Sequence, residues 1–225
     1  MSYFEANNIS KVWDNFSISL SFEAQQASMT CIVGPSGCGK STTLRLIAGL
    51  EKTNENMLIK LDGKDITKEK AGKRNIGLVS QNAALFLNMK VKENVAYGLA
   101  CRGRNRKDRE KEALKYLELF NLKGFADRYP DTLSGGEAQR VALARTLIVK
   151  PKLILFDEPF SALDAPLRKK LALEIKHLQK EISFTGIMVT HDIEEAKNIA
   201  DKIILMRAGK KEWEGKSEYF FENMI

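Results

Sequence analysis

The sequence predicts an α/β fold built on a mostly parallel sheet, with a helical subdomain inserted in its middle. Toward the C-terminus, short apolar runs alternate with stretches of helical periodicity, which is typical of parallel α/β sheets. The expected strands are 153–156, 186–190 and 202–206, and the expected helices are 165–182 and about 192–200. Between about residues 90 and 150, helical spacing is continuous instead.

The N-terminal part is rich in expected strands. Residues 16–22 (FSISLSF) alternate apolar residues with Ser, which indicates a half-buried strand. The apolar run 29–33 leads into a glycine-rich turn, and a helical stretch follows Gly39. Further strands are expected at 57–61 and 76–79.

The middle block is predicted to be helical because its apolar residues recur at helical spacing. Val91, Val95 and Leu99 lie four residues apart, and 106–120 places Ala113 and Leu117 on one side. We expect a single domain over 1–225, with a core at about 1–85 and 151–225 and a helical subdomain at about 86–150.

Composition narrows the class of protein without choosing a function. A chain of 225 residues with 44% hydrophobic residues can bury a full core. The net charge of +7 suits nucleic acid, an anionic membrane or a polyphosphate ligand. The basic stretch 102–111 is interleaved with acidic residues, which favours a solvated helix face over nucleic-acid binding.

Cysteine usage and the apolar stretches indicate a cytosolic setting. Cys31, Cys38 and Cys101 have neither the spacing nor the density of a disulfide framework. The N-terminus lacks the pattern of a secretory signal, and no apolar run is long enough to span a membrane.

The strongest motif is G-x-x-x-x-G-K-[ST], placed between a strand and a helix. Its glycines let backbone N–H groups face phosphates, Lys40 adds a full positive charge, and Ser41 can ligate Mg²⁺. The alternative is an ordinary glycine-rich turn. The residues expected to hold the nucleotide here are Gly34, Pro35, Ser36, Gly37, Cys38, Gly39, Lys40, Ser41 and Thr42.

Two carboxylates follow the apolar run 153–156 at the strand end where α/β sheets bind ligands. Asp157 is expected to hold Mg²⁺ through water, and Glu158 to orient or deprotonate the attacking water. Taken alone, such an acidic pair is more often a helix cap or a solvated turn. Its pairing with Lys40 favours the catalytic interpretation.

A second anion-binding helix start is expected at Ser134, Gly135, Gly136 and Glu137, before the helical stretch 138–148. Ser followed three residues later by Glu is also a capping box. Both interpretations can hold, because a capped N-terminus still presents N–H groups to a phosphate.

With these motifs in order, nearly the whole chain resembles the ATP-binding cassette family. The resemblance implies a P-loop NTPase (RecA-like) core with N-terminal antiparallel strands, and ATP and Mg²⁺ as ligands. Residues 34–41 resemble the Walker A loop, 134–137 the signature and 157–158 the Walker B pair. By the same resemblance Gln81 is the Q-loop glutamine and a Mg²⁺ ligand, 161–164 is the D-loop ending in Asp164, and His191 is the switch histidine.

The resemblance also implies partners and a place in the cell. It implies hydrolysis at two composite sites in a homodimer or a pair of ATPase subunits, with no nucleic acid bound. The segment 81–95 resembles importer ATPases for sugars, polyamines, iron or sulfate, and is expected to meet integral membrane permease subunits. A substrate-binding protein and a peripheral position on the inner face of the cell membrane follow from the same resemblance.

Two residues carry weaker expectations. Trp13, expected shortly after the first strand, resembles the aromatic that stacks on adenine; otherwise it is plain packing. Cys38, near Lys40 and a helix start, is expected to have a lowered thiol pKa and to alkylate readily, while Cys31 stays inert.

Two departures from the family pattern accompany the resemblance. The turn at 53–56 reads TNEN where the family often has Gly or Pro. The chain ends at Ile225, without the C-terminal regulatory domain that many importer ATPases carry, so regulation through such a domain is not expected.

Rival functions lack the features they require. A DNA-repair or translation ATPase of the same family needs a coiled-coil insertion, a zinc hook or a second cassette. A P-loop kinase or GTPase leaves the LSGGE sequence unexplained.

Overall fold

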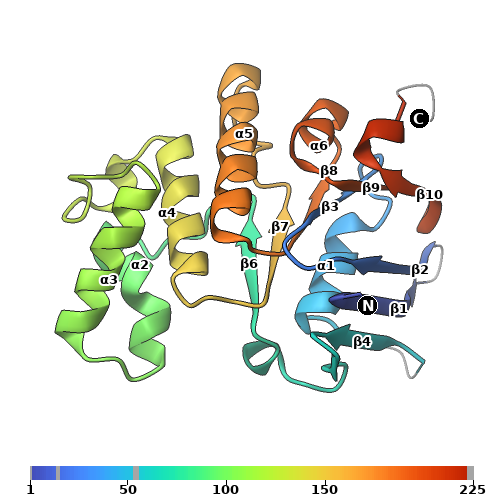
Figure 1. The fold of residues 1–225 in the computed structure, drawn as a ribbon, viewed down its shortest axis with the longest axis horizontal. Helices are drawn as coiled ribbons and strands as arrows, with labels where there is room; N and C mark the ends of the chain where they lie inside the picture. Colours follow the sequence, from blue (N-terminus) through green and yellow to red (C-terminus); the bar gives the residue numbers. More distant parts are fainter. Residues whose placement is uncertain (1, 14–15, 53–55, 222–225) are drawn as a thin grey trace.

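One sheet runs through the part of the chain that the structure, a computed structural model, describes: residues 2–13, 16–52 and 56–221. The turn at 53–56 lies outside these ranges except for Asn56. The described strands form a ten-stranded sheet in the order β5-β4-β1-β2-β10-β9-β3-β8-β7-β6. Figure 1 shows the helices distributed along it, with α1 beneath the strands near the middle and α2, α3 and α4 at one end.

One half of the sheet, from β9 to the edge strand β6, is parallel. Its strands are β3 (Met29–Val33), β6 (Ile76–Ser80), β7 (Leu153–Asp157), β8 (Gly186–Thr190) and β9 (Lys202–Arg207). All residues of β3 and β8 are buried, as expected of parallel strands covered on both faces. The predicted α/β class is therefore confirmed.

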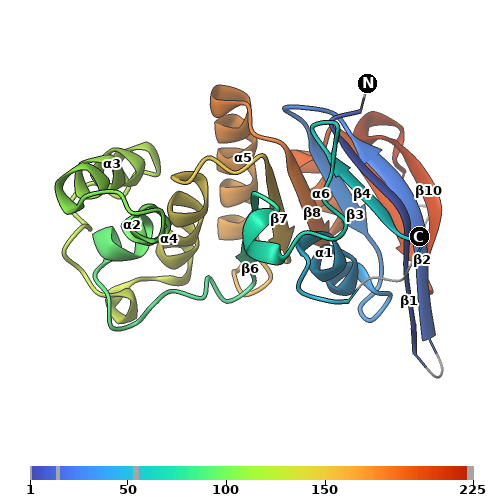
Figure 2. The same ribbon diagram turned by 90° about the horizontal axis from the view of Figure 1, so that it is seen from below.

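The rest of the sheet is mainly antiparallel. Its strands are β1 (Phe4–Trp13), β2 (Phe16–Ala24), β4 (Leu58–Leu61), β5 (Lys64–Asp65) and β10 (Lys210–Lys216). Figure 2 shows β1, β2, β4 and β10 together at the end opposite α2 and α3. Neither β1 nor β10 was predicted from the sequence. The residues of β10, KKEWEGK, are mostly charged and leave little apolar signal. Trp13, expected shortly after the first strand, is the last residue of β1.

The helices follow the predicted periodicity closely. They are α1 (Lys40–Ala48), α2 (Val91–Cys101), α3 (Arg106–Leu119), α4 (Gly135–Leu147), α5 (Ala165–Ile182) and α6 (Ile193–Ile199). Buried residues of α2–α4, such as Leu117 and Val141, belong to the same hydrophobic cluster as Ile154 and Phe156 of β7. This continuity supports our proposal that 1–225 is one domain with a helical subdomain at about 86–150.

The C-terminal end of α1 is held by a buried arginine. Arg74, 3% exposed, donates hydrogen bonds to the carbonyls of Leu46 and Ile47 in α1, and to those of Thr67 and Glu69. These bonds satisfy carbonyl groups that a helix end leaves unpaired. Burial lowers the pKa of the guanidinium. Arg74 thus fixes the helix whose other end carries Lys40.

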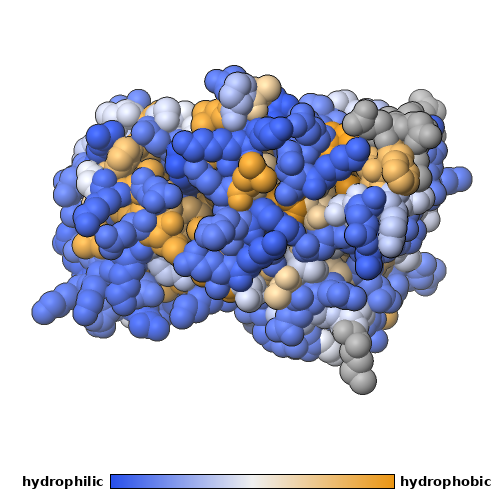
Figure 3. Space-filling model, turned by 45° about the horizontal axis from the view of Figure 1, so that its top comes forward, coloured by the Kyte–Doolittle hydropathy of each residue, from blue (hydrophilic) through white to orange (hydrophobic). Residues whose placement is uncertain are grey.

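The surface is largely hydrophilic. In the view of Figure 3, hydrophobic residues gather mainly over the end of the molecule that contains α2, α3 and α4, and near the middle of the visible face. None of the helices in the described ranges is both long enough and apolar enough to cross a bilayer.

Candidate functional site

The predicted phosphate loop lies between the last residue of β3 and the first turn of α1, where backbone contacts require its glycines. A Cβ at Gly34 would lie 2.0 Å from the carbonyl oxygen of Met206. Gly39 has φ +104°, and a Cβ there would lie 2.6 Å from the Ile18 side chain. Both the backbone conformation and the lack of space therefore disfavour any other residue at this position. Pro35, Ser36 and Gly37 are exposed. The loop is thus a tight backbone turn that opens to solvent at its tip.

Lys40 joins this loop to the acidic residues after β7. Its side chain is 4% exposed, and its ammonium donates hydrogen bonds to the carbonyls of Gly34 (2.8 Å) and Pro35 (2.9 Å). The same nitrogen lies 3.9 Å from Glu158 Oε1. A buried positive charge therefore lies between the loop and a carboxylate, where an incoming phosphate would compete for it.

The acidic pair meets α1 and β8 at the carboxyl edge of the sheet. Ser41 Oγ donates to Asp157 Oδ1 at 2.6 Å, and His191 Nδ1 lies 3.0 Å from Glu158 Oε2. These residues follow or terminate adjacent parallel strands, whose carboxyl ends share one edge. The structure thus brings together the predicted Lys40, Ser41, Asp157, Glu158 and His191.

The donor set suits Mg²⁺. The Ser41 hydroxyl and the Asp157 carboxylate are adjacent hard oxygen ligands, of the kind that hold Mg²⁺ together with waters and substrate phosphates. Gln81 comes directly after Ser80, the β6 residue in register with Asp157. Its side chain is exposed, and its proposed metal role rests on this position.

Glu158 has an unusual backbone conformation. Its φ is +46°, in the left-handed region, which costs a non-glycine residue roughly 1–3 kcal/mol. The neighbouring loop holds it there, because Ser161 donates to the Glu158 carbonyl from both its N–H (3.3 Å) and its hydroxyl (2.9 Å). The carboxylate is therefore presented by a strained turn, a feature concentrated at functional sites.

The start of α4 forms a capping box, as its sequence suggested. Glu137 N–H donates to Ser134 Oγ at 3.4 Å, and Ser134 N–H donates to Glu137 Oε2 at 2.8 Å. The bond from the Ser134 backbone lowers the pKa of Glu137. Ser134 and Gly135 are exposed, and in Figures 1 and 2 β6, β7 and α5 separate α4 from α1. The structure does not bring this helix start to the chain's own Lys40.

Two further predicted residues make their described contacts with other parts of the chain. Asp164 is exposed and caps α5 by accepting from Leu167 N–H at 2.9 Å. Trp13 is 41% exposed, with the Lys11 ammonium 5.0 Å from its ring centroid and the Phe16 ring at 5.9 Å.

Sequence reasoning missed a buried amide that ties the neighbouring loops together. Gln139 of α4 is 4% exposed and donates to the carbonyl of Gln81 at 2.9 Å and to that of Pro159. The spacing in the sequence could have indicated its burial, because Gln139 precedes the apolar Ala142 and Leu143 by three and four residues and so shares their helix face.

The expectation for Cys38 was wrong. Cys38 is 4% exposed and packs in the hydrophobic cluster around α1. Burial raises the pKa of the Cys38 thiol, and the charge of Lys40 only partly opposes this. The sequence showed the nearby positive charge but not the inward direction of the side chain.

A labelling order follows from these environments. Maleimide should modify the exposed Cys101 at least about tenfold faster than Cys38 or Cys31, because the buried thiols are shielded and their pKa values are raised. Peptide mapping by mass spectrometry over a time course measures the three rates. Equal rates at Cys38 and Cys101 would contradict the buried placement.

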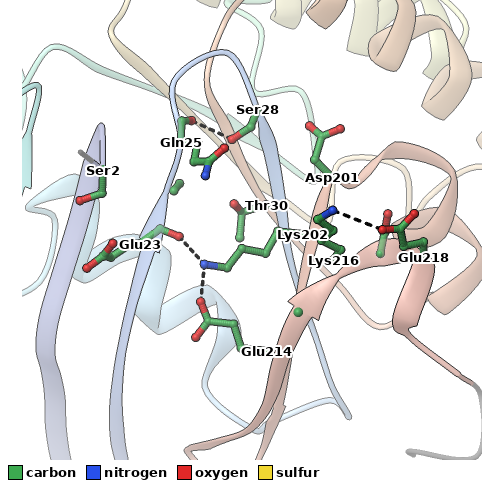
Figure 4. A pocket seen from close by; sticks show the side chains of 13 residues that line it. Ser2, Glu23, Gln25, Ser28, Thr30, Asp201, Lys202, Glu214, Lys216 and Glu218 are labelled. Atoms are coloured by element: carbon green, nitrogen blue, oxygen red, sulfur yellow. Dashed lines mark hydrogen bonds and ion pairs between the residues drawn. The ribbon is translucent and has the colours of Figure 1, made fainter.

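A cavity lies elsewhere and is lined by none of the predicted site residues. It measures about 750 Å³ and is lined by residues at the amino ends of β3 and β9 and at the ends of β2 and β10. Figure 4 shows Lys202 between Glu214, with which it forms an ion pair, and the Glu23 carbonyl, to which it donates at 2.8 Å. The cavity lies at the amino ends of the parallel strands, whereas the Lys40 cluster lies at their carboxyl ends.

The comparisons with known proteins agree with this geometry. A model of the ABC transporter family matches residues 18–161. The chain belongs to this family. As an ABC transporter chain it shares its fold with cbiO1 from Clostridium perfringens, described as part of the ABC transporter complex cbiONQ. That structure is 24% identical with a TM-score of 0.86, over 96% of this chain and 89% of that one. The ADP conformation of MJ1267, an ATP-binding cassette of an ABC transporter, is 25% identical with a TM-score of 0.83, over 96% and 91%.

Curated relatives of this ABC transporter chain carry import names. It is 46% identical to an Fe(3+) ions import ATP-binding protein from Pasteurella multocida, over 88% of this chain and 56% of that protein. It is 48% identical to a spermidine/putrescine import ATP-binding protein from Spiroplasma citri (91% and 59%). It is 42% identical to a sulfate/thiosulfate import ATP-binding protein from Synechocystis (96% and 61%). The chain thus spans about three fifths of the length of these relatives.

Proposed function

We propose that this ABC transporter chain hydrolyses MgATP and energises the import of a solute through separate membrane subunits. The observation that carries the proposal is the convergence of Lys40, the Ser41–Asp157 pair and the Glu158–His191 pair at one sheet edge. Phosphoryl transfer asks a protein mainly for positioning and charge stabilisation, which these groups supply.

Each residue has a role in this proposal. Lys40 and the N–H groups of 34–42 bind the phosphates, and Trp13 stacks on the adenine ring. Ser41, Asp157 and Gln81 would hold Mg²⁺, which when bound neutralises phosphate charge. Glu158 orients the attacking water and takes its proton, while His191, 3.0 Å from Glu158, faces the terminal phosphate.

The second half of each site would come from another ATPase chain. The helix start at 134–137 is exposed at Ser134 and Gly135, and β6, β7 and α5 separate α4 from α1, which begins at Lys40. This favours a head-to-tail pair in which the helix start, together with Asp164, meets the partner's nucleotide. A site divided between two chains couples hydrolysis to their relative motion.

Contact with the permease is proposed at the segment that follows Gln81. Leu87 is 71% exposed, and Phe86 packs against Tyr97 with ring centroids 4.5 Å apart and the rings tilted. Such exposed apolar residues suit a protein interface. The import names of the relatives support a peripheral position on the cytoplasmic face of the membrane and a substrate-binding protein as a further partner.

Complementation between two inactive variants tests the composite site. Lys40→Ala should remove phosphate binding, and Ser134→Arg should place a bulky cation at the helix start meant for the partner's nucleotide. In a heterodimer of the two variants, one site is intact and the other carries both lesions. We expect the mixture to recover part of the ATPase activity but not the wild-type rate, because at most one site per dimer can work.

Steady-state phosphate release by each variant and by the mixture gives the result. GTP in place of ATP provides the substrate control that separates this function from a GTPase. Either variant hydrolysing ATP at the wild-type rate, or a mixture that reaches the wild-type rate, would refute the composite site.

A further inference from the structure

One arginine joins the loop at 161–164 to the residue after His191. Arg168 lies in the first turn of α5, and its guanidinium donates to Asp192 Oδ2 at 2.6 Å and to the Leu163 carbonyl at 3.1 Å. The two acceptors, Leu163 and Asp192, lie on either side of β8 in the chain. A single side chain therefore fixes the distance between two loops.

Asp192 is in turn rigidly held. Its N–H donates to Thr190 Oγ1 at 3.0 Å, and its Oδ1 caps α6 by accepting from Glu195 N–H at 3.0 Å. The Arg168–Asp192 pair is mostly buried, with side chains 23% and 26% exposed, so water screens it less than a surface pair. His191 lies between two anchored neighbours, and a displacement of Asp192 moves it relative to Glu158.

The other end of the connection reaches the start of α4. A Cβ added at Gly135 would lie 3.1 Å from Leu163, and one at Gly136 would lie 3.3 Å from Leu167. The helix start at 134–137 thus packs directly on the residues that flank Arg168. A continuous set of contacts leads from α4 through Leu163, Arg168 and Asp192 to His191.

We propose that Arg168 is a positioning residue that couples the helix start of α4 to His191 of the same chain. This inference rests on the proposed function, in which that helix start contacts the nucleotide of one composite site and His191 serves the other. Closure at the first site presses on Leu163, and Arg168 transmits the movement to the Glu158–His191 pair of the second. ATP hydrolysis at the two sites is then cooperative.

The chain offers a matched control one residue away. Lys169 donates to Glu194 Oε1 at 2.8 Å and joins the same two helices, α5 and α6. This pair is 58% and 70% exposed, and its bond goes to neither of the loops that Arg168 joins. Removing it tests whether any ion pair between these helices has the same effect.

The first readout is kinetic. Arg168→Met keeps the aliphatic stem but removes both hydrogen bonds, and should lower kcat about tenfold and bring the Hill coefficient for ATP toward one. The KM for ATP should change less than about twofold, because the phosphate loop is untouched. Arg168→Lys should restore part of kcat through Asp192 alone, and Lys169→Met should behave as wild type.

The second readout does not depend on hydrolysis. The chain has two histidines, so a His177→Gln background leaves His191 as the source of the imidazole NMR signals. Arg168→Met should shift these signals and Lys169→Met should not. Asp192→Asn, which keeps an acceptor for Glu195 N–H, cuts the same connection from its other side and replaces Arg168→Met if that variant does not fold.

The outcomes separate the two proposals. A wild type without ATPase activity would refute the proposed function, while the His191 signals would still decide the coupling within the chain. An active wild type whose Arg168→Met variant keeps its kcat, its Hill coefficient and its His191 signals would overturn the positioning role.

Discussion

Replacing Glu158 with Gln should lower ATP turnover on the order of 10²-fold or more while leaving ATP binding intact. Gln keeps the shape of the side chain but cannot take a proton from the attacking water. The carboxylate it removes lies 3.0 Å from His191 Nδ1 and 3.9 Å from the Lys40 ammonium. With binding intact and hydrolysis blocked, the pair of chains should remain closed around ATP.

Size-exclusion chromatography with MgATP, combined with a phosphate-release assay, measures both effects. The variant should elute as a dimer with ATP and as a monomer without nucleotide. Lys40→Ala is the control, because it should lose both binding and dimerisation. A Glu158→Gln protein that hydrolyses at the wild-type rate, or stays monomeric with ATP at high concentration, would remove Glu158 from the role of general base.

The elements predicted most closely from sequence are those whose apolar pattern is regular along their length. β3, β8 and α5 have the predicted bounds, because a buried parallel strand is a continuous apolar run and a long amphipathic helix repeats its pattern many times. β10 was missed for the opposite reason: its residues are exposed or half-buried, and its place in the sheet comes from pairing with β9.

The site residues were predictable where chemistry and position coincide. Lys40, Asp157 and His191 each follow or end a buried strand, and adjacent parallel strands bring such positions to one edge. The supporting contacts were not predictable. Gln139 and Arg74 act through backbone carbonyls distant in sequence, and a carbonyl carries no residue-type signal. Arg168 pairs with the Asp192 carboxylate across β8, and nothing in the sequence marks these two charges as partners. The orientation of the Cys38 side chain was not predictable either, because the motif specifies the backbone at this position and not the side-chain rotamer.

Glu195 is a buried acid whose titration should be visible in the stability of the protein. It is 5% exposed, and its Oε2 accepts from Thr190 Oγ1 at 2.6 Å. Its other oxygen is buried without a hydrogen-bond partner among the described residues. Burial raises the pKa of Glu195 from 4.5 to about 7, and the nearby charge of Asp192 adds to this.

The sign of the pH dependence follows from this raised pKa. Between pH 4.5 and about 7 the folded state binds more protons at Glu195 than the unfolded state, so the free energy of unfolding falls as pH rises. Stability from the protonated carboxyl is fully present below pH 4.5 and lost above pH 7. A shift of this size corresponds to about 3 kcal/mol.

Glu195→Gln should therefore make the protein more stable at pH 8, by up to about 3 kcal/mol, and should change little at pH 4.5. The Gln side chain can still accept the Thr190 hydroxyl through its carbonyl oxygen, and it carries no charge to desolvate at any pH. Urea unfolding at both pH values measures the difference, with Glu194→Gln, whose side chain is 70% exposed, as the control. Equal stabilities of wild type and Glu195→Gln at pH 8 would mean that the folded protein holds the ionised carboxylate without cost, and the raised pKa of Glu195 would then be refuted.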